Sequence, residues 1–300
     1  MRENLMKIKG WSALLLLCSL VFGGFCACAP AADAPAGTEE IPAVTGAVTD
    51  EETEAETEPP ETEAPAGPVS VLFIGNSHTY FNDMPVIFGQ IAKADGREIA
   101  VKSVTKGGWT LEKHANKNDE CGKQIDRLLR EERFDFVILQ ENSDMLMSSA
   151  YYPARYEAAV GSLVGRIRKN GAEPILYSTW GNWLSKNTMD TEKTRTLAKR
   201  NTSIGRELDV PVAYAGFAFM EVYADPRNQL KLHYTDNHHP SLSGSYLAAM
   251  TIYAAAFPDS DIRSVSFQGK LPDAVADVLK AAAYKAVKDP DSYFSEDFLF

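Results

Sequence analysis

The sequence predicts an α/β fold in which helices cover both faces of a parallel sheet. Short apolar runs rich in β-branched residues, such as Val69 to Ile74, alternate along the chain with longer segments in which apolar residues keep helical spacing. Each apolar run stops at small or polar residues, as the first one does at Gly75 to His78. Strands that alternate with helices at this spacing form right-handed βαβ units and assemble into one parallel sheet.

About five strands are predicted, all in the part of the chain after residue 68. Their expected ranges are 69–74, 98–104, 134–139, 172–177 and 210–214. The first three end in Gly75-Asn76-Ser77-His78, in Lys106-Gly107-Gly108, and in Gln140-Glu141-Asn142. Because the carboxyl ends of parallel strands meet at one edge of the sheet, we expect these three loops to lie together.

Helices are predicted between and after the strands. Their expected ranges are 83–94, 125–129, 151–170, 191–207, 215–223, 241–257 and 275–286. Pro85 is tolerated in the first turn of its helix, and Gly171 is a suitable residue to end the helix before it. The chain shows no internal repeat, so residues 69–300 are expected to form a single domain.

The first 28 residues have the layout of a secretory signal peptide. Basic residues at positions 2, 7 and 9 precede an apolar run at 11–27, which is short for a membrane span. Phe25-Cys26-Ala27-Cys28 resembles a bacterial lipobox, in which small residues precede the cysteine that receives lipid. We expect lipidation at Cys28, with an ordinary signal peptide or an uncleaved anchor as alternatives.

Residues 29–68 form a linker, mostly of Ala, Pro, Thr, Glu and Gly, with eleven acidic residues and no lysine or arginine. The net charge is +2 for residues 1–28, −11 for 29–68 and −2 for 69–300, so the acidity of the chain belongs to the linker. A segment with low hydrophobicity and high like charge is expected to be a disordered spacer. No basic patch with interleaved aromatic residues is present, which argues against nucleic-acid binding.

Few cysteines remain after the predicted cleavage. Only Cys28 and Cys121 would be left, and Cys28 would carry lipid, so no internal disulfide is expected.

Ser77 is the candidate nucleophile, because it follows the first strand directly. A serine needs a base that takes its proton and a group that orients the base. His239 is the best base, since it lies three residues after Asp236 and before Pro240, which gives its loop a defined course. His238 has the right chemistry without that spacing and ranks second.

Three donors are candidates for an oxyanion hole. They are the backbone N–H of Ser77, the backbone N–H of Gly108 and the side-chain amide of Asn142. An alternative chemistry makes Asp236, His238 and His239 metal ligands, but adjacent histidines seldom reach one ion together.

These residues resemble the four sequence blocks of the SGNH (GDSL-like) hydrolases. The blocks are Gly75-Asn76-Ser77, then Gly108 with Trp109-Thr110, then Asn142, and last Asp236-x-x-His239-Pro240. They occur in the order of the family, over residues 69 to about 257. The resemblance implies a flavodoxin-like three-layer α/β/α sandwich and a serine esterase or lipase mechanism that needs no metal or cofactor. It also implies Ser77, Asp236 and His239 as catalytic residues, and Ser77, Gly108 and Asn142 as the oxyanion hole.

Two blocks depart from the family pattern. Asn76 stands where aspartate is commonest, and the third block lacks the usual Gly-x-Asn-Asp, so Gln140 could supply the amide in place of Asn142. No Gly-x-Ser-x-Gly elbow is present, which argues against the α/β-hydrolase fold.

The sequence therefore predicts a surface-tethered serine esterase, expected to remove acetyl groups from a carbohydrate outside the cytoplasm, held at the bacterial cell membrane by its lipid. Its partners would be an ester-bearing small molecule or an acetylated glycan, with lipase and transferase activities open within the same family. Aromatic side chains in the strand-end loops, namely Tyr80, Trp109, Trp180 and Trp183, are candidates to stack on sugar rings. The alternative is a non-catalytic lipoprotein that binds a solute or glycan in the same cleft.

Overall fold

The computed structural model describes residues 67–185 and 187–294. The chain separates into two units, Met1–Glu61 and Thr62–Phe300, and the described residues belong to the second. The predicted signal peptide (1–28), the predicted lipidation at Cys28 and residues 29–66 of the predicted linker lie outside the described residues. Those assignments stay predictions.

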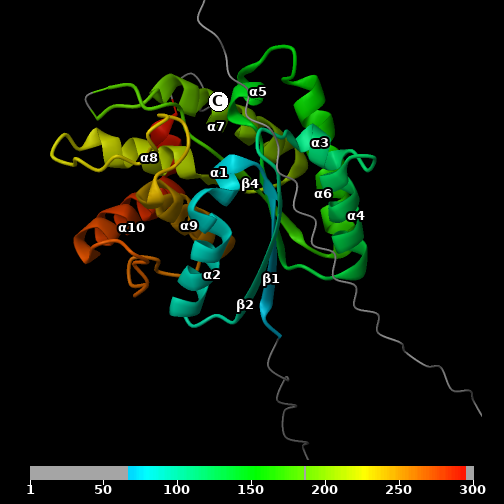
Figure 1. The fold of residues 1–300 in the computed structure, drawn as a ribbon, viewed down its shortest axis with the longest axis horizontal. Coiled ribbons are helices and arrows are strands. Elements are labelled where there is room, and N and C mark those ends of the chain that lie inside the picture. The colour runs from blue at the N-terminus through cyan, green and yellow to red at the C-terminus, as the bar shows by residue number, and fades with distance from the viewer. Residues whose placement is uncertain (1–66, 186, 295–300) are drawn as a thin grey trace, which may run out of the picture. The chain divides into compact units, whose positions relative to one another are not determined.

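A five-stranded parallel sheet forms the centre of the described unit (Figure 1). Its strands are β1 (Val69–Gly75), β2 (Ile99–Thr105), β3 (Phe136–Gln140), β4 (Glu173–Ser178) and β5 (Val212–Tyr214). The order across the sheet is β2-β1-β3-β4-β5, which is the order of flavodoxin-like folds. The predicted fold class is confirmed, and the strand ends differ from the predicted ones by no more than two residues.

Helices cover both faces of this sheet. In Figure 1, α2 (Met84–Ala94), α8 (Ala215–Ala224), α9 (Leu242–Ala256) and α10 (Asp273–Lys288) lie to the left of the strands. The helices α4 (Glu120–Glu131) and α6 (Ala154–Asn170) lie to the right, and α7 (Thr191–Leu208) contributes to the cores on both faces. The three-layer arrangement buries most of β1, β3 and β4, whereas the edge strand β2 keeps several exposed residues.

Strand β1 shows why a continuous apolar run was needed. Val71 and Phe73 pack into the core with α2 and α9, whereas Leu72 and Ile74 pack into the core with α4 and α6. All four side chains have no exposed surface. Successive side chains of a strand point to opposite faces, so a strand covered on both faces is apolar throughout.

Short helices at the strand ends were not predicted. They are α1 (Ser77–Tyr80), α3 (Leu111–Ala115) and α5 (Ser143–Met147), with 3₁₀ turns at Phe81–Asp83 and Pro290–Tyr293. One or two helical turns are too short to show a 3.6-residue period in the sequence. Each of the three α-helices begins in a loop that follows β1, β2 or β3, so these turns shape the candidate site.

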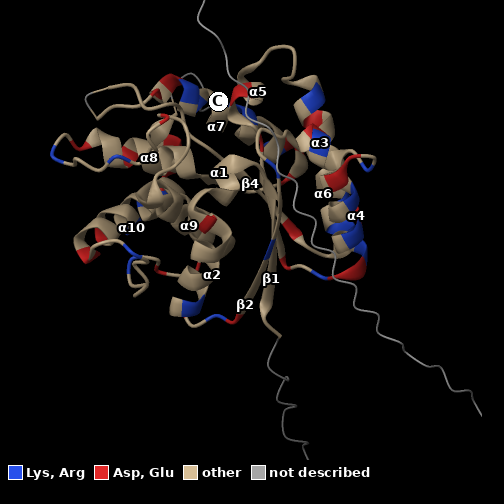
Figure 2. Cartoon of the chain, viewed as in Figure 1, with Lys and Arg blue, Asp and Glu red and all other residues tan. Residues whose placement is uncertain are grey.

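Charged residues of both signs lie on α4 and α6, whereas the ribbon of α1 carries none (Figure 2). Within the described ranges, the structure has no helix with the length and apolar character needed to span a bilayer.

Candidate active site

The turn that carries Ser77 is fixed by Asn76. The Asn76 side chain is 1% exposed; its Oδ1 accepts from the backbone N–H of His78 at 3.1 Å, and its Nδ2 donates to the carbonyl of Trp109 at 3.0 Å. The first bond caps α1, and the second ties the turn after β1 to the loop after β2. Ser77 is therefore the first residue of a capped helical turn at the carboxyl edge of the sheet.

Gln140 supports the same turn from beneath. Its Oε1 accepts from the backbone N–H of Asn76 and from the hydroxyl of Thr79, both at 2.8 Å, and its Nε2 donates to the carbonyl of Glu141. Gly75 leaves room for this amide, since a Cβ there would lie 2.6 Å from Oε1. Gln140 has no exposed surface, whereas Asn142 is half-buried, which makes Asn142 the better candidate for an oxyanion donor.

The structure brings together the three predicted triad residues. The Ser77 Oγ lies 2.8 Å from Nε2 of His239, and Nδ1 of His239 lies 2.7 Å from a carboxylate oxygen of Asp236. With its proton on Nδ1, the imidazole donates to Asp236 and accepts from the Ser77 hydroxyl. This is the hydrogen-bond chain by which a histidine activates a serine.

The Asp236 carboxylate is ionised. Partial burial alone would raise its pKa, but hydrogen bonds from the His239 ring and from the backbone N–H groups of His238 and His239 outweigh burial and lower the pKa to about 2. An ionised carboxylate at this position holds the tautomer of the ring and stabilises the imidazolium that forms when the serine loses its proton.

Phe81 holds the other side of the base. Its ring stacks on the His239 ring with centroids 4.2 Å apart and planes 6° from parallel. Asn82 follows, and its amide donates to the carbonyl of Pro240 and to the hydroxyl of Ser245. The segment after the nucleophile therefore also positions the loop of the base, which sequence spacing gave no sign of.

Two further histidines lie beside the triad. The ring of His78 lies 4.6 Å from that of His238 and 5.4 Å from that of His239. Burial, and then the neighbouring His238, lower the pKa of His78 well below its usual range, and burial likewise lowers the pKa of His238. Both rings thus stay neutral near pH 7 and place no fixed positive charge against His239.

The same cluster is the candidate for a metal ion. Single ligand atoms of His78, His238 and His239 lie within 4.8 Å of one another. However, Ser77 and Asp236 occupy both nitrogen atoms of the His239 ring. This hydrogen bonding fits a catalytic triad better than the metal site of Asp236, His238 and His239 that was weighed from the sequence.

Donors for an oxyanion are available where the sequence predicted them. Among the described residues, the backbone N–H groups of Ser77 and Gly108 donate to no protein acceptor. The Asn142 side chain uses Oδ1 to cap α5, and its Nδ2 donates to the carbonyl of Gly108 at 3.1 Å. One N–H of that amide stays free, and the amide is held against the Gly108 loop.

Glu141 links these donor loops and was not predicted. It is 3% exposed, and its carboxylate accepts from the backbone N–H of Leu111 at 3.1 Å, from the Tyr151 hydroxyl at 2.7 Å and from the backbone N–H of Asn142. Burial raises its pKa to about 7, although these hydrogen bonds favour the ionised form. No sequence pattern distinguishes this glutamate from a solvated loop residue.

The structure resembles several solved proteins. One is described as "a putative SGNH hydrolase from Slackia heliotrinireducens"; it is 25% identical with a TM-score of 0.54, and the match covers 63% of this chain and 99% of that one. The chain has the SGNH hydrolase fold. A DUF4886 family protein from Bacteroides uniformis is 18% identical with a TM-score of 0.61, over 74% of this chain and 96% of that one. No protein-family model and no curated protein matches the chain.

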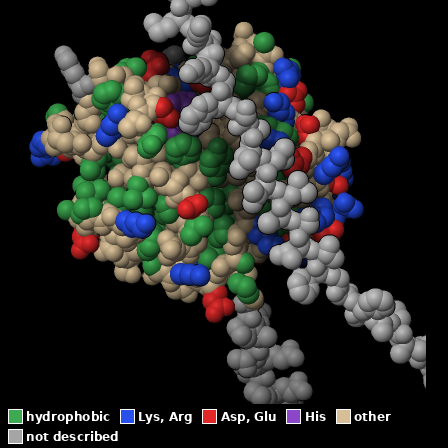
Figure 3. Space-filling view, viewed as in Figure 1, with side chains coloured by type: hydrophobic (Ala, Val, Ile, Leu, Met, Phe, Trp, Pro, Cys, Tyr) green, Lys and Arg blue, Asp and Glu red, His purple; other side chains and the backbone are tan. Residues whose placement is uncertain are grey.

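Within this SGNH hydrolase fold, the candidate site is open to solvent. The His239 side chain is 22% exposed and that of Asp236 is 42% exposed. In the space-filling view, histidine atoms reach the surface beside a carboxylate, with hydrophobic side chains directly below them in the region of α1 (Figure 3). A substrate can therefore reach the nucleophile while most of its bulk stays in solvent.

The tryptophans are not all placed as expected. Trp180 is 1% exposed and stacks on Phe219 with centroids 4.0 Å apart, so it belongs to the core and cannot meet a sugar. Trp109 and Trp183 are half-buried. Tyr80 is exposed, as a stacking residue must be.

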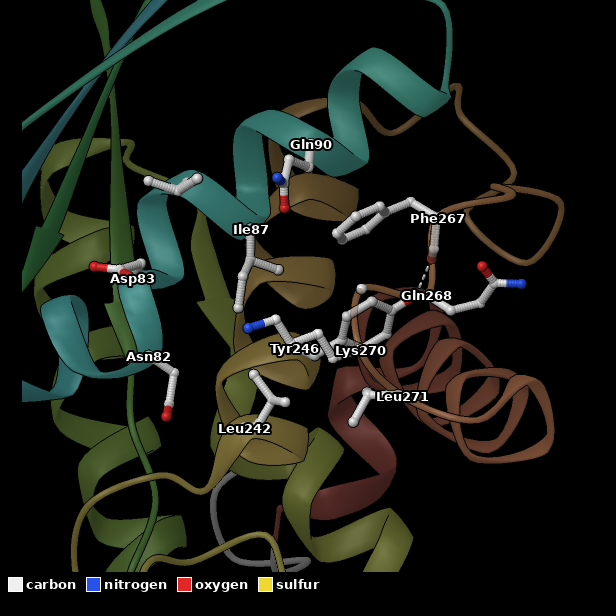
Figure 4. Close-up of a pocket in the computed structure, with 12 residues that line it drawn as sticks. Asn82, Asp83, Ile87, Gln90, Leu242, Tyr246, Phe267, Gln268, Lys270 and Leu271 are labelled. Carbon is white, nitrogen blue, oxygen red and sulfur yellow. Dashed lines mark hydrogen bonds between the residues drawn. The ribbon is translucent and has the colours of Figure 1, made fainter.

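A cavity of about 410 Å³ lies beside the site rather than in it, between α2, α9 and the segment 267–271. It is lined by neither Ser77 nor His239, and it begins at Asn82 and Asp83. Figure 4 shows the Gln90 side chain facing the ring of Phe267, and the amine of Lys270 directed toward Ile87.

Proposed function

We propose that the protein is a serine esterase of the SGNH type. The observation that carries this proposal is the continuous hydrogen-bond chain from Ser77 through His239 to Asp236, at 2.8 and 2.7 Å. Residues 162 positions apart meet in this chain at the edge of the sheet where a flavodoxin-like fold binds its ligands.

The first half of the reaction forms an acyl-enzyme. Ser77 Oγ attacks the carbonyl carbon of the ester while His239 Nε2 takes its proton, and Asp236 stabilises the imidazolium. The free N–H groups of Ser77, Gly108 and Asn142 donate hydrogen bonds to the former carbonyl oxygen and stabilise its negative charge. Each such donor contributes about 3–4 kcal/mol of transition-state stabilisation. His239 then gives its proton to the departing alcohol.

The second half releases the acid. A water molecule donates a proton to His239 Nε2 and attacks the acyl carbon, and the same donors hold the second oxyanion. Collapse of this intermediate breaks the bond to Ser77 Oγ, which takes the proton back from His239.

The substrate is proposed to be an acetylated carbohydrate. The exposed triad suits a substrate whose large alcohol part stays outside the protein while a small acyl group enters. The predicted export of the chain would bring the site to glycans outside the cytoplasm.

The test of the esterase is Ser77→Ala in the full chain, assayed on p-nitrophenyl acetate and on acetylated xylan. We expect kcat to fall by about 10⁴-fold or more on both substrates, because no nucleophile remains. Circular dichroism and the urea midpoint should match those of the unaltered chain. Equal rates for a well-folded Ser77→Ala protein would remove Ser77 from the mechanism.

We also propose that the domain is tethered to the membrane by lipid on Cys28, from the lipobox-like residues before it and the acidic spacer after it. Cys28→Ala should shift the protein from the membrane fraction to the soluble fraction after export, with its esterase activity retained. Retention of the altered chain in the membrane fraction would contradict the proposal.

A further inference from the structure

Exposed aromatic side chains line one side of the proposed active site. Among the large hydrophobic residues of the described part, Tyr80 is 41% exposed and Tyr234 is 50% exposed. Buried aromatic rings need no special explanation, whereas exposed ones that lie together indicate a binding surface. Both tyrosines flank Phe81, whose ring stacks on the base.

The contacts make these rings one surface. The Tyr80 and Phe81 rings stack with centroids 5.9 Å apart, and the Phe81 and Tyr234 rings meet edge to face at 6.0 Å. The Tyr80 hydroxyl lies over Gly107, because a Cβ on that glycine would be 3.0 Å from it. We call Tyr80, Phe81 and Tyr234 the aromatic rim; it runs from the Gly107–Gly108 loop past His239 to the loop of Asp236.

The rim has the chemistry of a carbohydrate subsite. Its rings offer apolar faces to the C–H groups of a sugar, and its two tyrosine hydroxyls can bond to sugar hydroxyls. A long acyl chain, by contrast, gains most from an enclosed apolar cavity that removes it from water. The rim is open to solvent and edged with hydroxyl groups, so its character favours the sugar over the acyl chain.

The surface continues beyond the rim. Phe81 is followed by Asn82 and Asp83, which line the 410 Å³ cavity (Figure 4). The side chains of Asp83, Gln90 and Lys270 form no hydrogen bond or ion pair with any other described residue, so these polar groups are available at its edge. The Phe267 ring supplies a further apolar face there. The cavity is large enough to receive more of a glycan that already lies on the rim.

We propose that the aromatic rim binds the sugar part of the substrate, and that longer glycans extend from the rim into the cavity. This proposal rests on the proposed esterase function and names the part of the molecule that recognises its alcohol half. A bound oligosaccharide would lie beside Ser77 with its acetyl ester turned toward the oxyanion donors.

The experiment compares three esters: p-nitrophenyl acetate, which has no sugar; p-nitrophenyl laurate, which has a long acyl chain; and partially acetylated xylo-oligosaccharides. Tyr80→Ala and Tyr234→Ala are made in the full chain, with Val278→Ala, an exposed residue of α10, as the matched control. Each tyrosine variant should lose about five- to ten-fold more kcat/KM on the oligosaccharides than on p-nitrophenyl acetate, since one stacking contact is lost. The control should retain its kcat/KM on every substrate.

A length series tests the cavity. Phe267→Ala should reduce kcat/KM on acetylated tetrasaccharides several-fold more than on acetylated disaccharides, with its urea midpoint measured alongside. An equal loss at both lengths would remove the cavity from the proposal.

Equal losses on all three esters, or a loss confined to the laurate, would overturn the proposal for the rim. The unaltered chain is also assayed on acetylated manno-oligosaccharides. If it deacetylates neither these nor the xylo-oligosaccharides, the proposal for the rim is overturned as well. The esterase proposal fails separately, because it is decided by Ser77→Ala on p-nitrophenyl acetate.

Discussion

The nucleophile and the base of the candidate site are held in opposite ways. The turn of Ser77 depends on buried side chains from distant parts of the chain, above all Gln140 under Asn76 and Thr79. The carboxylate that orients His239 is instead held locally and is 42% exposed, since Asp236 accepts from the ring and from the next backbone N–H groups. Damage to the first support should cost stability and activity together, and damage to the second should cost activity alone.

Asp236→Asn should break the base and leave the fold intact. The amide can donate to Nδ1 and so favours the wrong tautomer of His239, and it cannot stabilise an imidazolium. We expect kcat on p-nitrophenyl acetate to fall by about 10³-fold, with the urea midpoint nearly unchanged because the side chain is 42% exposed. Asp225→Asn, in the exposed loop before it, is the control. A large loss of stability with Asp236→Asn would show that the two supports do not differ as described.

Gln140→Leu should damage the nucleophile turn in both respects. The change leaves the Asn76 N–H and the Thr79 hydroxyl buried without an acceptor, at about 1–3 kcal/mol each. We expect the free energy of unfolding to fall by about 3 kcal/mol and kcat to fall by about ten-fold or more as the turn relaxes. Gln124→Leu on the exposed face of α4 should change neither quantity. If Gln140→Leu kept full stability, the turn would not depend on this amide.

The buried carboxyl group of Glu141 should make the stability of the protein depend on pH. Its pKa is about 7 in the folded protein against an ordinary value of 4.5, so between these values the folded state holds a proton that the unfolded state releases. Stability from this group is therefore lost as the pH rises through that window, by about 3 kcal/mol. Urea unfolding between pH 4.5 and 8 should show the unaltered chain losing about this much relative to Glu141→Gln. For Glu120→Gln, at an exposed glutamate, the free energy of unfolding should change with pH as it does in the unaltered chain. If Glu141→Gln also followed the unaltered chain at every pH, Glu141 would ionise at its ordinary pKa.

The sheet and the triad were predictable from the sequence because their patterns are local. Apolar runs such as Val69 to Ile74 mark buried strands, and the spacing of Asp236 and His239 suits a short turn in which one side chain reaches the other. Because the strands of the predicted sheet are parallel, the ends of β1, β2 and β3 are expected at the same edge, whatever their side chains. Ser77, Gly108 and Asn142 could therefore be assigned to one edge.

The supports of the site were not predictable, because they depend on contacts between distant residues. Gln140 was considered from the sequence as an oxyanion donor and Glu141 as an ordinary strand-end residue. The folded chain instead shows Gln140 under the turn of Ser77, and Glu141 between the loops of Gly108 and Asn142. Trp180 was expected at the surface, but its ring fills the core against Phe219. Exposure of a large aromatic residue is decided by packing, which spacing along the chain does not report.

The two hydrogen bonds of Asn82 have a consequence for turnover. They join the segment after Ser77 to Pro240, which directly follows the base, and to Ser245 in α9. These contacts belong to the fold that places Ser77 Oγ 2.8 Å from His239 Nε2. Because folding itself arranges these groups, the entropic part of the barrier to attack on an ester is lower.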